Sequence, residues 1–131
     1  AVTRPAPMAP VASGQVTAGE RWQPWSVQRE RELLAQGKPV FVDYTAAWCV
    51  TCQYNKQTTL SNTAVLADFD ARGVVLLRAD WTRRDPAITA SLAALGRSGV
   101  PVYVLHVPGR APAVLSELLS PADVRALLAT L

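Results

Sequence analysis

The sequence predicts an α/β domain with a central mixed β-sheet of about four to five strands and helices on both sides. Short runs of β-branched and aromatic residues alternate with segments that begin at Ser or Asp and end at Gly, as strands alternate with capped helices. The order is strand, helix, strand, then a helix, then two strands and a final helix. Such an order requires both parallel and antiparallel pairing in one sheet.

Length and composition limit the chain to one globular domain. The chain has 131 residues, of which 50% are hydrophobic and 18% are charged. Its net charge of +3 is dispersed, and the adjacent basic residues Arg83 and Arg84 are expected in a solvated loop, so nucleic acid is not an expected partner. No apolar run approaches the length of a membrane span, and no signal peptide opens the chain.

The elements are predicted in order from caps, stops and periodicity. Residues 1–21 are rich in Ala and Pro and are interpreted as a flexible linker, and residues 22–131 as the folded domain. A short extended segment, Trp22–Trp25, leads into it. Helices are predicted over 27–36, 49–59, 63–71, 86–95 and from 121, with Leu131 on the last apolar face, and strands from 40 into 44 and over 74–79, 102–107 and 113–116. Ser26, Asp85 and Ser120 are the expected N-caps.

Two cysteines, Cys49 and Cys52, stand where the first strand runs into a helix. The first sulfur then lies at the helix N-terminus, where unpaired N–H groups and the helix dipole stabilise a thiolate. The second lies one turn on, on the same helix face, close enough to bond the first. We therefore expect Cys49 to be the more exposed nucleophile and Cys52 the buried resolving cysteine.

Other functions for this pair are less well supported. So short a ring would add only about 2 kcal/mol as a structural staple. A tetrahedral metal site needs four ligands, and the only histidine, His106, is distant in sequence, so no metal is expected. Covalent haem attachment would require His after Cys52, where Gln53 stands. Inert buried thiols remain open.

Several other residues have two interpretations. By pattern alone, Asp43 within an apolar strand is an acid satisfied by nearby backbone, although an unpaired buried carboxylate would be costly and its pKa raised. Trp48 is expected at the rim of the dithiol, and Trp81 either there or in the core. Tyr44 and Tyr54 are expected to pack, and His106 to be a hydrogen-bonded strand or edge histidine.

The segment Val-Asp-Tyr-Thr-Ala-Ala-Trp-Cys-Val-Thr-Cys resembles the active-site segment of the thioredoxin superfamily. More narrowly, it is similar to the C-terminal periplasmic domain of the DsbD/ScsB thiol:disulfide interchange protein family. The likeness extends through Val74–Trp81 and Gly99-Val100-Pro101, and so covers roughly residues 22–131. It implies a thioredoxin-like fold.

The resemblance also implies roles for single residues. Asp43 would be the proton acceptor and donor for the resolving cysteine. Pro101 would be a cis-proline facing the dithiol, whereas base rates alone predict a trans bond. The backbone of Gly99 and Val100 would pair with a substrate segment beside Trp48. Lys56 stands where the family often has Glu, and a cation there would stabilise the thiolate instead of raising its pKa.

The function implied is thiol:disulfide exchange in the reductase direction, without a bound cofactor. Electrons would come from a membrane-embedded cysteine pair of the parent protein and pass to periplasmic partners, including thioredoxin-like acceptors of cytochrome c maturation and an N-terminal domain of the same protein. The domain would be monomeric and would belong to an inner-membrane protein. A disulfide oxidase or isomerase, a non-catalytic thioredoxin-like module and a copper-handling Cys-x-x-Cys module remain alternatives, because direction depends on the reduction potential.

Overall fold

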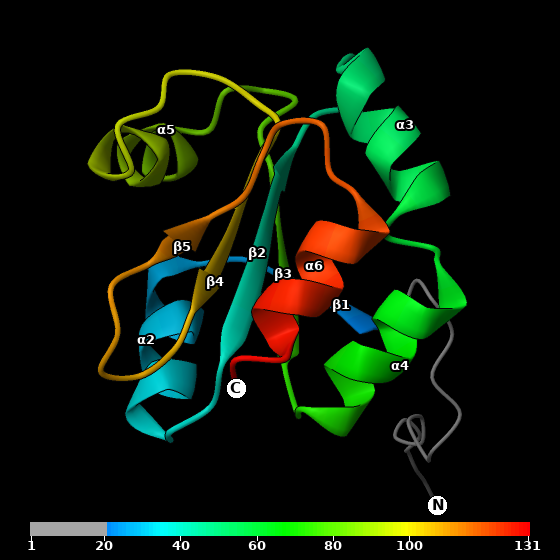
Figure 1. The fold of residues 1–131 in the computed structure, drawn as a ribbon. Coiled ribbons are helices and arrows are strands. Elements are labelled where there is room, and N and C mark those ends of the chain that lie inside the picture. The colour runs from blue at the N-terminus through cyan, green and yellow to red at the C-terminus, as the bar shows by residue number, and fades with distance from the viewer. Residues whose placement is uncertain (1–20) are drawn as a thin grey trace, which may run out of the picture.

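A computed structural model describes residues 21–131 (Figure 1). The predicted linker over residues 1–21 lies outside this part of the chain, except for Arg21. The helices described are α2 (Val27–Ala35), α3 (Val50–Thr58), α4 (Thr63–Ala71), α5 (Pro86–Ala94) and α6 (Pro121–Leu128). The strands described are β1 (Trp22–Pro24), β2 (Val40–Thr45), β3 (Val75–Asp80), β4 (Val102–His106) and β5 (Ala113–Val114).

These strands form one mixed sheet in the order β1-β3-β2-β4-β5. Strand β2 lies at its centre, parallel to β3 and antiparallel to β4, and β5 is antiparallel to β4. The predicted α/β class and the mixed sheet of parallel and antiparallel strands are therefore confirmed. The segment predicted only as extended, Trp22–Trp25, contains the edge strand β1, which pairs in parallel with β3. Pro24 is tolerated there because an edge strand leaves one side of its backbone unpaired.

Helices cover both faces of the sheet, with α2 and α5 on one face and α4 and α6 on the other (Figure 1). Because side chains alternate along a strand, β2 contributes to both resulting cores. Val40, Val42 and Tyr44 pack with Leu33 of α2 and Leu92 of α5. On the opposite face, the residues packed together are Phe41, Val65, Phe69, Leu105, Val124 and Leu128.

The expected N-cap residues are present, and the bounds of the helices and strands differ from those predicted mainly near the C-terminus. The side chains of Ser26, Asp85 and Ser120 accept backbone N–H groups at the starts of α2, α5 and α6. Helix α6 ends at Leu128, because Thr130 and Leu131 donate to carbonyls three residues back, in the tighter turn that often closes a helix. Strand β5 is shorter than predicted, and residues after it, Glu117 and Leu119, bond to Asn55 of α3 instead of continuing the sheet.

The topology gathers three loops at one edge of the sheet. The parallel strands β2 and β3 end at the same edge, and antiparallel β4 begins there, with Tyr44 paired to Val102. The loops after β2 and β3 and the loop before β4 therefore meet beside the start of α3. This edge positions the candidate site. Among the described residues, no helix is both long enough and apolar enough to cross a membrane.

A stability prediction comes from the segment after β5. Leu119 is 4% exposed and packs in the α4/α6 core, whereas its neighbour Leu118 is 63% exposed. Leu119→Ala should lower the free energy of unfolding by about 2–4 kcal/mol through lost burial and a residual cavity. Leu118→Ala, the matched control, should change it by less than about 1 kcal/mol. Urea unfolding of the oxidised protein measures both, and equal losses would contradict the packing described.

Candidate exchange site

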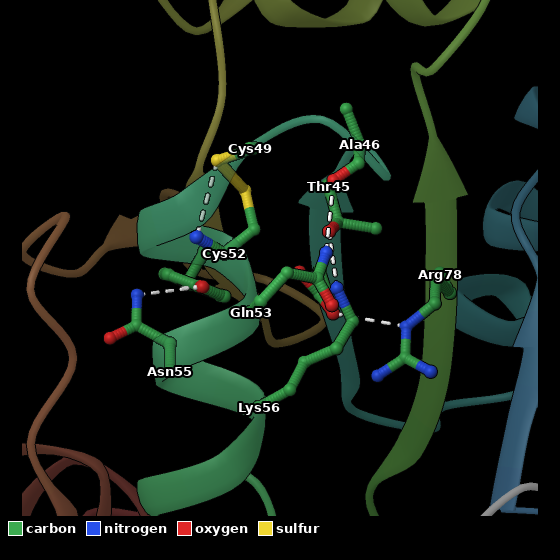
Figure 2. Close-up of polar contacts among 10 residues, drawn as sticks. Thr45, Ala46, Cys49, Cys52, Gln53, Asn55, Lys56 and Arg78 are labelled. Carbon is green, nitrogen blue, oxygen red and sulfur yellow. Dashed lines mark hydrogen bonds and ion pairs between the residues drawn. A yellow bond between two sulfur atoms is a disulfide. The ribbon is translucent and has the colours of Figure 1, made fainter.

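Cys49 and Cys52 form a disulfide at the start of α3, with their Cα atoms 5.2 Å apart (Figure 2). Cys49 is the N-cap of the helix. Its backbone is extended, and its sulfur accepts the N–H of Cys52 at 3.2 Å, as a Ser or Asp side chain does at an ordinary helix start. The reactive sulfur thus occupies the position where the free N–H groups of the helix point. A thiolate formed there is stabilised by those donors and by the helix dipole.

The two cysteines differ in exposure in the predicted sense. Cys49 is 7% exposed to solvent, and Cys52 is fully buried. Ala46 and Val100 pack against the pair. Cys49 is therefore open to solvent only through a narrow window, and Cys52 is enclosed. An incoming sulfur can approach Cys49 directly, whereas Cys52 is placed to attack the Cys49 sulfur after that sulfur has bonded to a partner.

Asp43 lies fully buried on β2, on the face that α3 covers. Its partner is a side chain and not nearby backbone, because Arg78 Nε of β3 donates to Oδ2 at 3.0 Å. Its Oδ1 has no hydrogen-bond partner among the described residues. Burial raises the pKa of the Asp43 carboxyl, and the charges of Arg78 and Lys56 and the hydrogen bond from Arg78 oppose that rise without cancelling it.

Lys56 extends from α3 towards the same region, as Figure 2 shows. Its Nζ donates to the hydroxyl of Thr45, the last residue of β2. Burial lowers the pKa of Lys56, Asp43 raises it in part, and Arg78 lowers it further. Lys56 therefore acts electrostatically on the buried carboxylate. An open depression of about 230 Å³ lies over this group and is lined by Thr45, Ala46, Ala47, Gln53, Lys56, Arg78, Asp80 and Thr82.

Trp48 forms the rim that was predicted from its place before Cys49. It is 49% exposed, and its Nε1–H donates to the Thr82 carbonyl at 3.0 Å. Trp81 is buried in the core, where its Nε1–H donates to Thr89, yet its ring lies 6.0 Å from that of Trp48. Trp81 therefore supports the rim from below and does not line the surface.

The loop before β4 completes the site. The Val100–Pro101 peptide bond is cis, the conformation that the family resemblance implies. Val100 packs against the sulfur pair, and Gly99 precedes it. A Cβ added to Gly99 would meet nothing within 4 Å in the chain, so the fold itself does not require glycine there. An open pocket of about 300 Å³ adjoins this loop, and its lining includes Gly99, Val100, Arg97 and Glu117.

Two structural partners were not identified from the sequence. Arg78 lies within an apolar run, and an Arg in such a strand is as strong a signal as Asp43, which stands opposite it in the β2–β3 register. Buried Asn55 of α3 donates to the Tyr103 hydroxyl and the Glu117 carbonyl, both at 2.8 Å, and accepts from Leu119 N. It ties α3 to β4 and to the segment after β5.

Two predictions for single residues were wrong. Tyr54 is exposed, because the buried face of α3 is set by Cys52 and Asn55 and Tyr54 points away from it. His106 has no hydrogen bond at Nε2 within the described residues. Its nearest acceptor, Glu30 Oε1, lies 3.7 Å away and already accepts from Trp25 Nε1. Tyr44 is buried as predicted, with its hydroxyl bonded to Ser91.

Within residues 21–131, no three His, Cys, Asp or Glu side chains gather as a metal site would require. The hydrogen bond to the sulfur pair comes from the backbone N–H of Cys52, whereas Lys56 and Arg78 bond to Thr45 and Asp43 of β2. The chemistry that this arrangement supports is therefore sulfur exchange at Cys49, with a buried acid of raised pKa on the neighbouring strand.

The sequence of this chain matches a known protein family and several curated proteins. A family model described as thioredoxin-like matches residues 21–108. The chain is 40% identical over 70 residues to the thiol:disulfide interchange protein DsbD of Cronobacter sakazakii, covering 53% of this chain and 12% of that protein. It is 34% identical over 78 residues to DsbD 1 of Pseudomonas aeruginosa, covering 60% of this chain and 13% of that one. The chain thus spans about an eighth of the length of these relatives.

Solved structures show the same fold. The reduced C-terminal domain of DsbD from Neisseria meningitidis superposes with a TM-score of 0.66 at 19% identity, over 80% of this chain and 96% of that domain. Its oxidised form gives a TM-score of 0.67 at 18% identity, over 82% and 96%. A thioredoxin from Thermus thermophilus gives 0.66 at 22% identity, over 84% of this chain and 85% of that one.

The raised pKa of Asp43 predicts a pH dependence of stability. As pH rises above about 4, an unfolded Asp releases its proton while folded Asp43 retains it, so folding is progressively disfavoured until the folded pKa is passed. Asp43→Asn removes this loss. Its free energy of unfolding should therefore increase relative to wild type as pH rises from 4 to 8.

Urea unfolding of the oxidised proteins measures the effect, since the bonded cysteines do not titrate. Asp123→Asn, at an exposed position, is the matched control for the substitution. A difference between wild type and Asp43→Asn that decreases as pH rises would contradict the assignment.

Proposed function

The chain belongs to the thioredoxin-like family, and we propose that within it this domain is a protein-disulfide reductase that acts through Cys49 and Cys52. The observation that carries the proposal is the disulfide at the start of α3, with Cys49 as both helix N-cap and the more exposed sulfur. Similarity to thiol:disulfide interchange proteins supports exchange as the reaction. The reductase direction is our inference from that similarity.

The reaction has two exchange steps. In the reduced domain, the Cys49 thiolate attacks one sulfur of a partner disulfide, and the other partner sulfur leaves as a thiolate. Cys52 then loses its proton and attacks the Cys49 sulfur, which releases the second partner thiolate and restores the Cys49–Cys52 disulfide. The partner gains two electrons and the domain loses two. The N–H groups at the start of α3 favour the attacking thiolate over its thiol.

Asp43 is proposed as the proton acceptor for Cys52. A general base works best when its pKa lies near the working pH, and burial moves the Asp43 pKa upward in that direction. Arg78 and Lys56 limit the rise, so they are proposed to tune the acid. The depression over Lys56 and Arg78 offers solvent a route towards the carboxyl for proton exchange. We propose Lys56 as a residue that acts on the thiolate mainly through Asp43.

The substrate segment is proposed to bind across the loop before β4. The Gly99–Val100 backbone is proposed to pair with it as a short strand, because main-chain pairing suits partners of varied sequence. The absence of a side chain at Gly99 leaves room for close approach. Half-exposed Trp48 and cis Pro101 would border the segment on either side of Cys49.

The partners are proposed from the family resemblance. We infer that electrons arrive from a membrane-embedded cysteine pair of a longer parent protein and leave to periplasmic thioredoxin-like or N-terminal-domain acceptors. Coverage of 96% of an isolated DsbD C-terminal domain, against 12% of a whole DsbD, supports a domain of a larger protein. We place it in the periplasm as a monomeric domain, with residues 1–21 as its linker.

Cysteine substitutions give a direct prediction. Cys49→Ala should reduce insulin disulfide reduction to the uncatalysed rate, because no sulfur remains to attack. Cys52→Ala should instead accumulate mixed disulfides, because the resolving sulfur is absent while Cys49 still reacts. Non-reducing gels and mass spectrometry of periplasmic extracts would identify the trapped partners.

The double variant Cys49→Ala/Cys52→Ala is the control for non-specific adducts. Activity retained in Cys49→Ala would overturn the proposal. So would binding of copper(I) by the reduced protein without any disulfide reduction, which would indicate a metal-handling module.

A second prediction concerns proton transfer. Asp43→Asn should slow the resolving step above neutral pH, because Asn cannot accept the Cys52 proton, and should leave the first attack by Cys49 nearly unchanged. Stopped-flow measurement of mixed-disulfide formation and decay from pH 6 to 9 separates the two steps. An identical pH profile of decay in wild type and variant would remove Asp43 from the mechanism.

A further inference from the structure

The loop after β3 contains an unusual backbone conformation beside the exchange site. Arg84 has φ +55°, the one non-glycine residue of the described chain with positive φ. Residues other than glycine rarely adopt this left-handed backbone conformation, and those that do cluster at functional sites. The Arg84 N–H donates to the Trp81 carbonyl at 2.9 Å, which closes a tight turn. The turn ends one residue before Asp85, the N-cap of α5.

This conformation places the Arg84 guanidinium over two indole rings. It lies 5.1 Å from the centroid of the Trp48 ring and 4.9 Å from that of Trp81. Both distances are within the range of cation–π attraction. Trp48 is also held through its Nε1–H on the Thr82 carbonyl, and Trp81 through Thr89. The cation therefore stands at a defined position beside the residue that precedes Cys49.

The two carboxylates that flank this turn each use one oxygen in hydrogen bonds to their own segment. Asp80 Oδ1 accepts the N–H and hydroxyl of Thr82. Asp85 Oδ1 accepts the N–H groups of Ala87 and Ile88 at 2.8 and 3.2 Å. Within residues 21–131, no acceptor makes a hydrogen bond or ion pair with the exposed Arg84 guanidinium, so its planar set of donors is held in place and available.

We propose that Arg84 is a specificity-determining residue of the exchange reaction, which binds a carboxylate that lies close to the reacting cysteine of the partner protein. The inference rests on the proposed function. A partner sulfur bonded to Cys49 brings its neighbouring residues over Trp48, and there the guanidinium can accept an Asp or Glu side chain in two parallel hydrogen bonds.

The preference would depend on position and not on net charge. The formal charges of Asp80, Arg83, Arg84 and Asp85 balance, so the loop has no net attraction for acidic partners. Arg83 is also exposed, carries the same charge and has no ring contact among the described residues. It therefore provides a matched control for Arg84.

The test uses the reduced chain and two disulfide-linked peptides that differ only by Glu or Gln next to the cysteine. Stopped-flow tryptophan fluorescence gives the second-order rate constant for each. Wild type should react about two- to fivefold faster with the Glu peptide, the size expected for an exposed ion pair. Arg84→Gln should remove the preference, and 0.5 M NaCl should weaken it. Arg83→Gln should retain it, and Arg84→Lys should retain only part, because Lys lacks the planar fork.

Each result supports or overturns the inference. Equal rate constants of wild type for the two peptides would overturn it while leaving the reductase function intact. So would equal slowing of both peptides in Arg84→Gln, which would show that Arg84 only positions Trp48. Loss of the preference in Arg83→Gln would overturn it in favour of general charge attraction. Reaction of wild type with neither peptide is the separate result that would reject the proposed function.

Discussion

The register of β2 between β3 and β4 is the constraint on which the site depends. Every residue of β2 is buried, so each of its two faces must suit a different core. A slip of one residue would exchange the faces and move Asp43 from the side of Lys56 and α3 into the apolar core beneath α2 and α5. The same register ends the strand at the edge where the three loops meet. The packing of Phe41 and Val42 thus positions Cys49 and Cys52, which follow several residues later.

The charges between β2 and α3 follow from this placement. Asp43 and Arg78 stand opposite each other in adjacent strands, and Lys56 approaches from the helix. The free energy lost when a carboxylate is removed from water can exceed the free energy gained from one ion pair, so a buried ion pair is a weak candidate for stabilising a fold. Here one carboxylate oxygen also lacks a partner within the described chain. A fold that needed only stability would be better served by an apolar side chain, and this favours a chemical role for Asp43.

Local signals in the sequence predicted much of this architecture, because they act over a few residues. Ser26, Asp85 and Ser120 each satisfy N–H groups two or three positions on, and the spacing of Cys49 and Cys52 on a helix decides whether they can bond. What was missed depends on distant partners. The burial of Asn55 depends on its hydrogen bonds with Tyr103 and Leu119, which are distant in sequence. The Nε2 atom of His106 has no hydrogen bond in the described part of the chain, because the nearest acceptor, Glu30 of α2, already accepts from Trp25. The three-residue strand β1 exists only because β3 provides an edge.

The capping of α3 by a sulfur has a consequence for the energetics of electron transfer. A thiolate accepts a hydrogen bond more strongly than a bonded sulfur does, so the Cys52 N–H favours the reduced form over the oxidised one. Helix order and redox state are then thermodynamically linked. Any change elsewhere in the molecule that frays the first turn of α3 would make the dithiol a better electron donor. Any contact that tightens this turn would make the disulfide a better electron acceptor.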